Sequence, residues 1–292
     1  MNGAIAYSPK KDDLYYPCKN AQFFPTGAPT SDAALCVELA RLAYCRSETT
    51  FAFDQTRIKN ELGKIGLTAA GFFESQQIKQ DGGTHCFVAV SNDQKLAVVA
   101  FRGTDKDDPT DMGDDINGLK VPWEGGGQVH RGFAGALAEV RPALEKTLQS
   151  IPGRLLFTGH SLGAALATLL AGIKVPDALY TFGSPLVGNS DFVATLSKVK
   201  NFRYVDCCDI VTRIPPKGLG YAHLGKPYYI AKDRSVTFDP GDSFIRNDRM
   251  EAFLEYPLEY HAWKKENVGV RELADHTPVN YVTAVTAATP PA

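Results

Sequence analysis

The sequence lacks the features that mark several large classes of protein. Its 292 residues contain no apolar run near the roughly 20 residues that a membrane-spanning helix needs. The 31 lysines and arginines nearly balance the 33 aspartates and glutamates, so the formal net charge of −2 predicts no basic surface for nucleic acid. No cluster of basic residues would hold an anionic membrane either. These absences predict a soluble protein that binds no nucleic acid and makes at most transient lipid-surface contact, through apolar side chains.

Residues 1–11 also lack the apolar core of a secretory signal, which favours a cytoplasmic location. Export by another route, or after removal of a signal, stays open. The six cysteines are sparse and show no metal-type C-x-x-C spacing, so we expect reduced, mainly structural thiols.

Helix and strand patterns alternate along the chain without a linker. They predict a single α/β domain over residues 1–292, with residues 1–30 as an extended N-terminal arm. Residues 48–83 are expected to form short helices and loops. The other expected elements are a helix from Ser31 or Asp32 to Ala43, a hairpin of residues 84–91 and 95–101, a helix at 133–148, strands at 154–158, 178–182 and 202–207, an edge strand at 228–231, and a helix from Arg249.

Residues 159–163 read Gly-His-Ser-Leu-Gly, between an apolar strand pattern and an Ala/Leu-rich helix pattern. Gly-x-Ser-x-Gly in this context predicts a nucleophile elbow, in which the serine sits on a strained turn and both glycines let strand and helix approach. Ser161 is therefore the candidate nucleophile. The backbone N–H of Leu162, at the start of the helix, is a candidate oxyanion donor. We interpret His160 as a packed, hydrogen-bonded core residue.

A serine nucleophile needs a base and an orienting acid, and on this type of fold both follow the serine in the chain. Of the later histidines, His276 lies in a loop that enters the last helix and is the preferred base. His223 and His261 have ordinary packing explanations.

Asp209 and Asp206 compete for the role of the acid. Both lie near the carboxyl end of a predicted strand, and Asp209 is preferred because it lies further out on the loop. Asp275, next to His276, is interpreted as a helix cap.

Six motifs resemble, in one order, those of the fungal-type class 3 lipases of the α/β-hydrolase superfamily. They are Phe-Arg-Gly-Thr at 101–104, Val-His-Arg-Gly-Phe at 129–133, the elbow at 159–163, Phe-Gly-Ser-Pro at 182–185 with Val-Gly-Asn at 187–189, Asp-Ile-Val at 209–211 with Arg213 and Pro215-Pro216, and Asp275-His276 with Tyr281.

The resemblance implies a mostly parallel central sheet flanked by helices and a lid segment. It also implies Ser161, Asp209 and His276 as the catalytic triad. Thr104 is implied as an oxyanion donor beside Leu162, and no cofactor is implied. The expected reaction is hydrolysis of acylglycerol-type esters, and the partner is a small-molecule ester or lipid.

The segment that corresponds to the lid departs from the family. Residues 105–115 carry six aspartates and one lysine, and a charged segment enters an oil surface only at high cost. We therefore expect weak interfacial activation. A solvated acidic loop is favoured over a calcium site, because the spacing lacks the order of a calcium loop. The predicted lid residues are Asp105, Asp107, Asp108, Asp111, Met112, Asp114 and Asp115.

Three alternatives remain open from the sequence. A feruloyl esterase or a phospholipase A1 would use the same scaffold and triad. A non-catalytic lipid-binding member is less favoured, because every triad position and Thr104 carry chemically competent residues.

Overall fold

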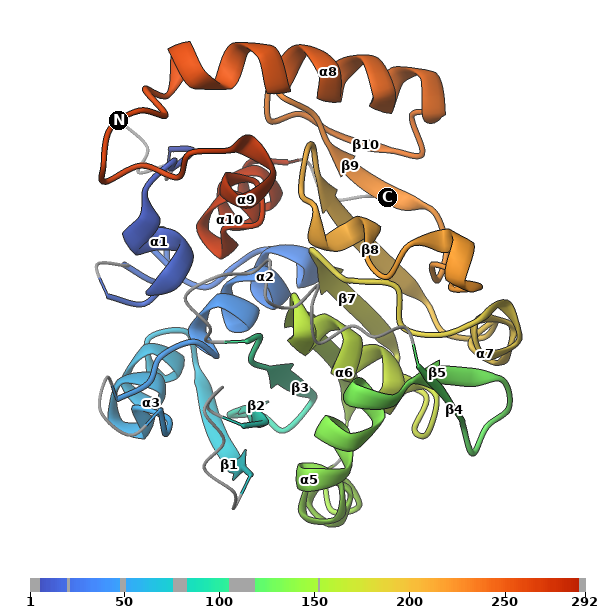
Figure 1. The fold of residues 1–292 in the computed structure, drawn as a ribbon. Helices are drawn as coiled ribbons and strands as arrows, with labels where there is room; N and C mark the ends of the chain where they lie inside the picture. Colours follow the sequence, from blue (N-terminus) through green and yellow to red (C-terminus); the bar gives the residue numbers. More distant parts are fainter. Residues whose placement is uncertain are drawn as a thin grey trace.

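A computed structural model describes residues 6–19, 22–47, 51–75, 83–104, 119–151 and 153–288 (Figure 1). Its centre is an eight-stranded sheet of order β1-β2-β3-β6-β7-β8-β9-β10. Strands β3, β6, β7, β8 and β9 run parallel, while β1, β2 and β10 are antiparallel to their neighbours. The expected mostly parallel sheet is confirmed.

The strands of this sheet are β1 (Leu67–Glu74), β2 (His85–Ser91), β3 (Leu96–Phe101), β6 (Arg154–His160), β7 (Ala178–Phe182), β8 (Asn201–Asp206), β9 (Pro227–Ile230) and β10 (Val236–Phe238). A separate ribbon pairs β4 (Lys120–Pro122) with β5 (Gln128–His130). The α-helices are α1 (Lys11–Tyr15), α2 (Asp32–Leu42), α3 (Gln55–Gly63), α5 (Arg131–Leu148), α6 (Leu162–Ala171), α7 (Ser190–Thr195), α8 (Asp242–Glu259), α9 (Arg271–Ala274) and α10 (Pro278–Ala287). Two 3₁₀ turns are η1 (Val211–Arg213) and η2 (Lys217–Leu219).

Helices cover both faces of the sheet. On one face α2 and α10 pack against the central strands, and on the other α5 and α6 do so (Figure 1). The Ala/Leu-rich α6 is buried along nearly its whole length, as its lack of a polar side requires. This arrangement leaves the carboxyl ends of β6, β7 and β8 as one edge where loops from different parts of the chain meet.

Several local predictions are confirmed. Ser31 caps α2 by accepting a hydrogen bond from the backbone N–H of Ala34 at 3.2 Å. The hairpin forms as β2 and β3, and the helix expected at 133–148 forms as α5.

Three predictions of elements are wrong. Residues 67–74 form strand β1 instead of a loop. Their hydrophobic pattern does not indicate a strand, and antiparallel pairing with β2 stabilises the extended conformation. Strand β9 is not an edge strand, since β10 covers it. Helix α8 begins at Asp242, seven residues before the expected start at Arg249, because Gly241, with φ of 91°, ends the preceding loop.

The N-terminal arm is not extended throughout. It contains α1, which lies beside α9 and α10 in Figure 1. A disulfide joins Cys18 to Cys45 just after α2, so the expectation of reduced thiols is wrong for this pair. Cys36, Cys86, Cys207 and Cys208 are free and buried, as expected for structural thiols.

Among the described residues, no helix combines the length and the apolar character that crossing a membrane requires.

Candidate active site

The predicted elbow forms between β6 and α6. Ser161 has φ of 59° and ψ of −129°, a conformation that non-glycine residues rarely adopt. A Cβ atom at Gly159 would lie 2.3 Å from the backbone of Gly163, and one at Gly163 would lie 2.3 Å from the carbonyl oxygen of Phe101. Both glycines are therefore required for the close approach of strand, helix and neighbouring strand.

The three predicted triad residues lie together. Ser161 Oγ is 2.9 Å from His276 Nε2, and His276 Nδ1 is 3.0 Å from each carboxylate oxygen of Asp209. Asp209 comes from the loop after β8, and His276 from the turn between α9 and α10. This geometry suits an Nδ1–H that donates to the carboxylate and an Nε2 that accepts the serine proton. It is the arrangement that activates a serine for attack on a carbonyl carbon.

Asp209 is held by two further donors. The backbone N–H of Val211 donates to Oδ1 at 2.9 Å, and the hydroxyl of Tyr281 donates to Oδ2 at 2.5 Å. Burial raises the pKa of Tyr281 well above its ordinary value, so its hydroxyl stays protonated. The sequence placed Tyr281 in a motif but assigned it no role.

Gly183 is a second residue whose role the sequence did not reveal. Its φ is +60°, and a Cβ atom there would lie 2.8 Å from Asp209 Oδ2 and 3.2 Å from the ring of His276. Only glycine leaves room for the acid and the base to meet at this point. The Phe-Gly-Ser-Pro motif was the signal that could have identified it.

His160 is buried and hydrogen-bonded, as expected. Its Nδ1 lies 2.8 Å from the hydroxyl of Tyr44, and its ring centroid is 4.5 Å from that of His276. Burial, with a contribution from His276, lowers the pKa of His160 well below its ordinary value. His160 is therefore neutral, and its ring packs against the imidazole of His276.

The two predicted oxyanion donors lie on segments that approach each other closely. Thr104 follows β3, and Leu162 opens α6; both are partly buried. At Gly103 a Cβ atom would lie 2.9 Å from the carbonyl oxygen of His160, so the β3 loop passes directly against the elbow.

The predicted lid, and with it any calcium site among its aspartates, lies outside the described residues. Its predicted members are Asp105, Asp107, Asp108, Asp111, Met112, Asp114 and Asp115.

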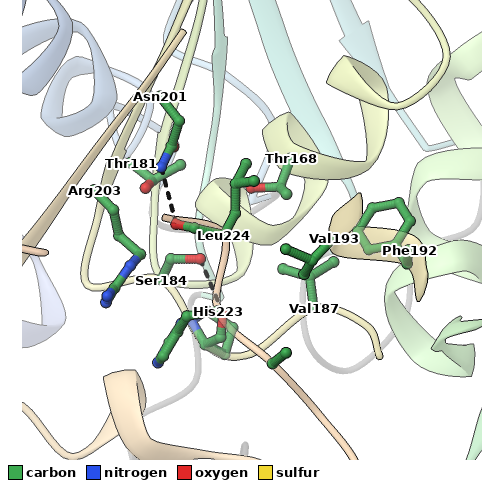
Figure 2. A pocket seen from close by; sticks show the side chains of 12 residues that line it. Thr168, Thr181, Ser184, Val187, Phe192, Val193, Asn201, Arg203, His223 and Leu224 are labelled. Atoms are coloured by element: carbon green, nitrogen blue, oxygen red, sulfur yellow. Dashed lines mark hydrogen bonds between the residues drawn. The ribbon is translucent and has the colours of Figure 1, made fainter. Parts of the chain in front are cut away.

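The competing histidine and acid have other contacts. His223 lines a small pocket together with Ser184 and Arg203 (Figure 2). Its Nε2 lies 2.8 Å from the carbonyl oxygen of Thr212. Asp206 is bound by both carboxylate oxygens to Arg234, at 2.8 and 2.9 Å. Neither residue is free to serve the serine.

Asp275 occupies a helix-cap position, but at the C-terminus of α9, where its backbone N–H bonds to the carbonyl oxygens of Arg271 and Leu273. The N-cap position of α10 belongs to Thr277, and the Asp275 carboxylate pairs with Arg271 at 3.1 Å. Asp275 also forms, with Cys207 and Cys208, a group close enough to hold a metal ion. The hydrogen bond between the Cys207 and Cys208 thiols, together with burial, raises the pKa of the Cys207 thiol, which disfavours the thiolate that a metal would need.

Known proteins are similar to this chain in sequence and in fold. The sequence model of the class 3 lipases matches residues 98–219, which include Ser161 and Asp209. The secreted mono- and diacylglycerol lipase A of Penicillium cyclopium is 28% identical over 222 residues, which cover 70% of this chain and 72% of the relative. The secreted mono- and diacylglycerol lipase 1 of Fusarium solani is 31% identical over 159 residues, 51% of this chain and 48% of the relative.

A solved structure gives the same result for the fold. The mono- and diacylglycerol lipase from Aspergillus oryzae superposes with a TM-score of 0.60 at 28% identity, over 72% of this chain and 86% of that one. Sequence, fold and site geometry thus agree with one another. Through residues 98–219 the chain matches the class 3 lipase family; it has the α/β-hydrolase fold and is a carboxylic ester hydrolase.

Proposed function

We propose that the chain is a lipase or esterase that hydrolyses acylglycerol esters through an acyl-enzyme on Ser161. The observation that carries this proposal is the continuous contact from Ser161 Oγ through the ring of His276 to Asp209, with distances of 2.9 and 3.0 Å. In the proposed roles, Ser161 is the nucleophile, His276 the base and Asp209 the orienting acid.

The mechanism follows from these positions. His276 Nε2 takes the proton of Ser161 as Oγ attacks the ester carbonyl, and Asp209 stabilises the imidazolium that forms. Thr104 and the Leu162 N–H hold the oxyanion of the tetrahedral intermediate. The imidazolium returns its proton to the leaving alcohol. Water, deprotonated by the same ring, then releases the acid and restores the serine. These steps need no cofactor.

The names of two relatives support glycerol esters as the substrate class. Both are mono- and diacylglycerol lipases, and neither is a feruloyl esterase or a phospholipase. We expect fatty acid release from a dispersed diacylglycerol, measured by titration at constant pH, to exceed release from methyl ferulate and from phosphatidylcholine at least tenfold. Faster hydrolysis of methyl ferulate or of phosphatidylcholine would instead identify the chain as a feruloyl esterase or a phospholipase.

The acidic segment leads to a separate prediction about lipid surfaces. Six aspartates within residues 105–115 disfavour insertion into oil, so the rate on tributyrin should rise smoothly as the substrate passes its solubility limit. Initial rates on either side of that limit, with a known interfacially activated lipase as the control, test it. A sharp jump at the limit would show that the segment does open on a lipid surface.

We infer an oxidising compartment for the mature protein. The Cys18–Cys45 disulfide supports this location, since such bonds persist mainly outside the reducing cytosol. Both relatives described above are named secreted proteins. The preference for the cytoplasm, which residues 1–11 suggested, receives no support from the disulfide or from these relatives.

A further inference from the structure

The N-terminal arm forms hydrogen bonds with the segment that carries His276. The backbone N–H of Val268 donates to the carbonyl oxygen of Pro9 at 2.7 Å. The backbone N–H of Ser8 donates to the side-chain oxygen of Asn280 at 2.7 Å, and the amide of Asn280 donates back to the carbonyl oxygen of Ser8 at 2.9 Å. These contacts lie on both sides of His276 in the sequence, so the arm fixes both ends of its turn.

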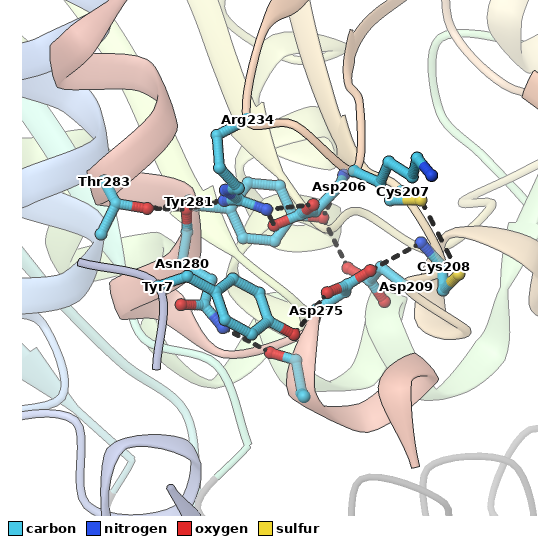
Figure 3. Close-up of polar contacts among 12 residues, drawn as sticks. Tyr7, Asp206, Cys207, Cys208, Asp209, Arg234, Asp275, Asn280, Tyr281 and Thr283 are labelled. Carbon is cyan, nitrogen blue, oxygen red and sulfur yellow. Dashed lines mark hydrogen bonds and ion pairs between the residues drawn. The ribbon is translucent and has the colours of Figure 1, made fainter. Parts of the chain in front are cut away.

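Within this turn, Asp275 lies against the loop that carries Cys208 and Asp209 (Figure 3). Its Oδ2 accepts a hydrogen bond from the backbone N–H of Cys208 at 2.9 Å. Asp275 immediately precedes His276, and Cys208 immediately precedes Asp209. The hydrogen bond between Asp275 and Cys208 therefore joins the two loops that carry the base and the acid. The residues that follow these two in the sequence form the 3.0 Å contact between imidazole and carboxylate.

Tyr7 of the arm completes the surroundings of Asp275. Its hydroxyl donates to Asp275 Oδ1 at 2.8 Å, while Arg271 Nε lies 3.1 and 3.3 Å from the two carboxylate oxygens. Asp275 is fully buried, so its orientation depends on these donors and not on water. Burial raises the pKa of Tyr7 well above its ordinary value, and its hydroxyl remains a donor at neutral pH.

We propose that Tyr7 and Asp275 are positioning residues for ester hydrolysis, in which Tyr7 orients Asp275 and Asp275 holds His276 in register with Asp209. This inference rests on the proposed triad. Neither residue reaches the reacting atoms; their effect passes through the geometry of the imidazole. The N-terminal arm is on this account part of the catalytic apparatus, although it lies about 270 residues from His276 in the sequence.

The variant Tyr7→Phe removes one hydroxyl and keeps the ring. We expect its kcat on p-nitrophenyl butyrate to fall about tenfold, because a hydrogen bond to a buried charge is lost, while KM changes less than about twofold. The rate of Ser161 labelling by a fluorophosphonate should fall by a similar factor. Tyr16→Phe, a more exposed tyrosine of the same arm, is the matched control and should behave as the unmodified protein.

A double-mutant cycle separates positioning from general support. In an Asp275→Asn background, Tyr7→Phe should cause a clearly smaller further loss of kcat, because its route to His276 is already broken. A Tyr7→Phe variant with lower thermal stability but unchanged kcat would overturn the inference. So would a Tyr7→Phe substitution that lowers kcat as much in the Asp275→Asn background as in the unmodified protein. Should Asp275→Asn fail to fold, the comparison of Tyr7→Phe with Tyr16→Phe decides alone.

The same experiment distinguishes this inference from the proposed function. If the unmodified protein shows no hydrolysis that depends on Ser161, both fail. If that hydrolysis is present and Tyr7→Phe matches Tyr16→Phe, only the role of the arm is wrong.

Discussion

Ser161→Ala is expected to lower kcat for ester hydrolysis by roughly 10⁶-fold, the scale seen when a triad serine is removed. Alanine cannot form the acyl-enzyme, and the remaining oxyanion donors give only a small fraction of the rate. The free energy of unfolding should change by less than about 1 kcal/mol, because the change removes one small side-chain oxygen and leaves the backbone turn in place.

The measurement is fatty acid release from a diacylglycerol, with denaturant unfolding of the same samples. Ser190→Ala, at an exposed serine at the start of α7, is the control and should retain full activity. Robust turnover by a folded Ser161→Ala variant would remove the serine from its proposed role.

Asp209→Asn is expected to lower kcat by about 10⁴-fold with little change in KM. An amide nitrogen facing His276 Nδ1 cannot accept its hydrogen bond, so the ring shifts to the tautomer that presents N–H to the serine. The remaining amide oxygen can still accept from the Val211 N–H, which bonds to Oδ1, while the Tyr281 hydroxyl, which bonds to Oδ2, loses its acceptor. The backbone hydrogen bond of Val211 should keep the loop in position.

Asp206→Asn provides the contrast, because Asp206 was the other candidate acid. Its carboxylate is bound to Arg234, and burial raises its pKa despite that partner. This substitution should lower the melting temperature and leave kcat per folded molecule within a few-fold. The reverse pattern, with Asp206→Asn inactive and Asp209→Asn active, would exchange the two roles.

The parts of the site that the sequence predicts are those encoded by short motifs of neighbouring residues. The elbow is local, because Gly159 and Gly163 exclude side chains within one turn of Ser161. The choice of Asp209 and His276 followed from chain order and from the motifs around them. The alternation of strands and helices likewise predicted the central sheet, because neighbouring parallel strands must be joined by crossover segments, which are usually helical.

The remaining parts depend on contacts between distant segments. Tyr281 meets Asp209 across 72 residues, and Tyr7 meets Asp275 across 268. No periodicity or spacing encodes such pairs. The Cys18–Cys45 disulfide was not predicted for a related reason. Six cysteines are compatible with many different pairings and also with no disulfide, and the sequence alone does not choose among them.

In the proposed mechanism, Ser161 carries the acyl group during turnover. Intact-mass analysis after reaction with a p-nitrophenyl phosphonate ester, followed by peptide mapping, tests it most directly. We expect one phosphonyl adduct per chain, located on Ser161, that appears in step with loss of activity and is absent from Ser161→Ala. Complete inactivation with the adduct on another residue, or a fully labelled Ser161 with activity retained, would contradict it.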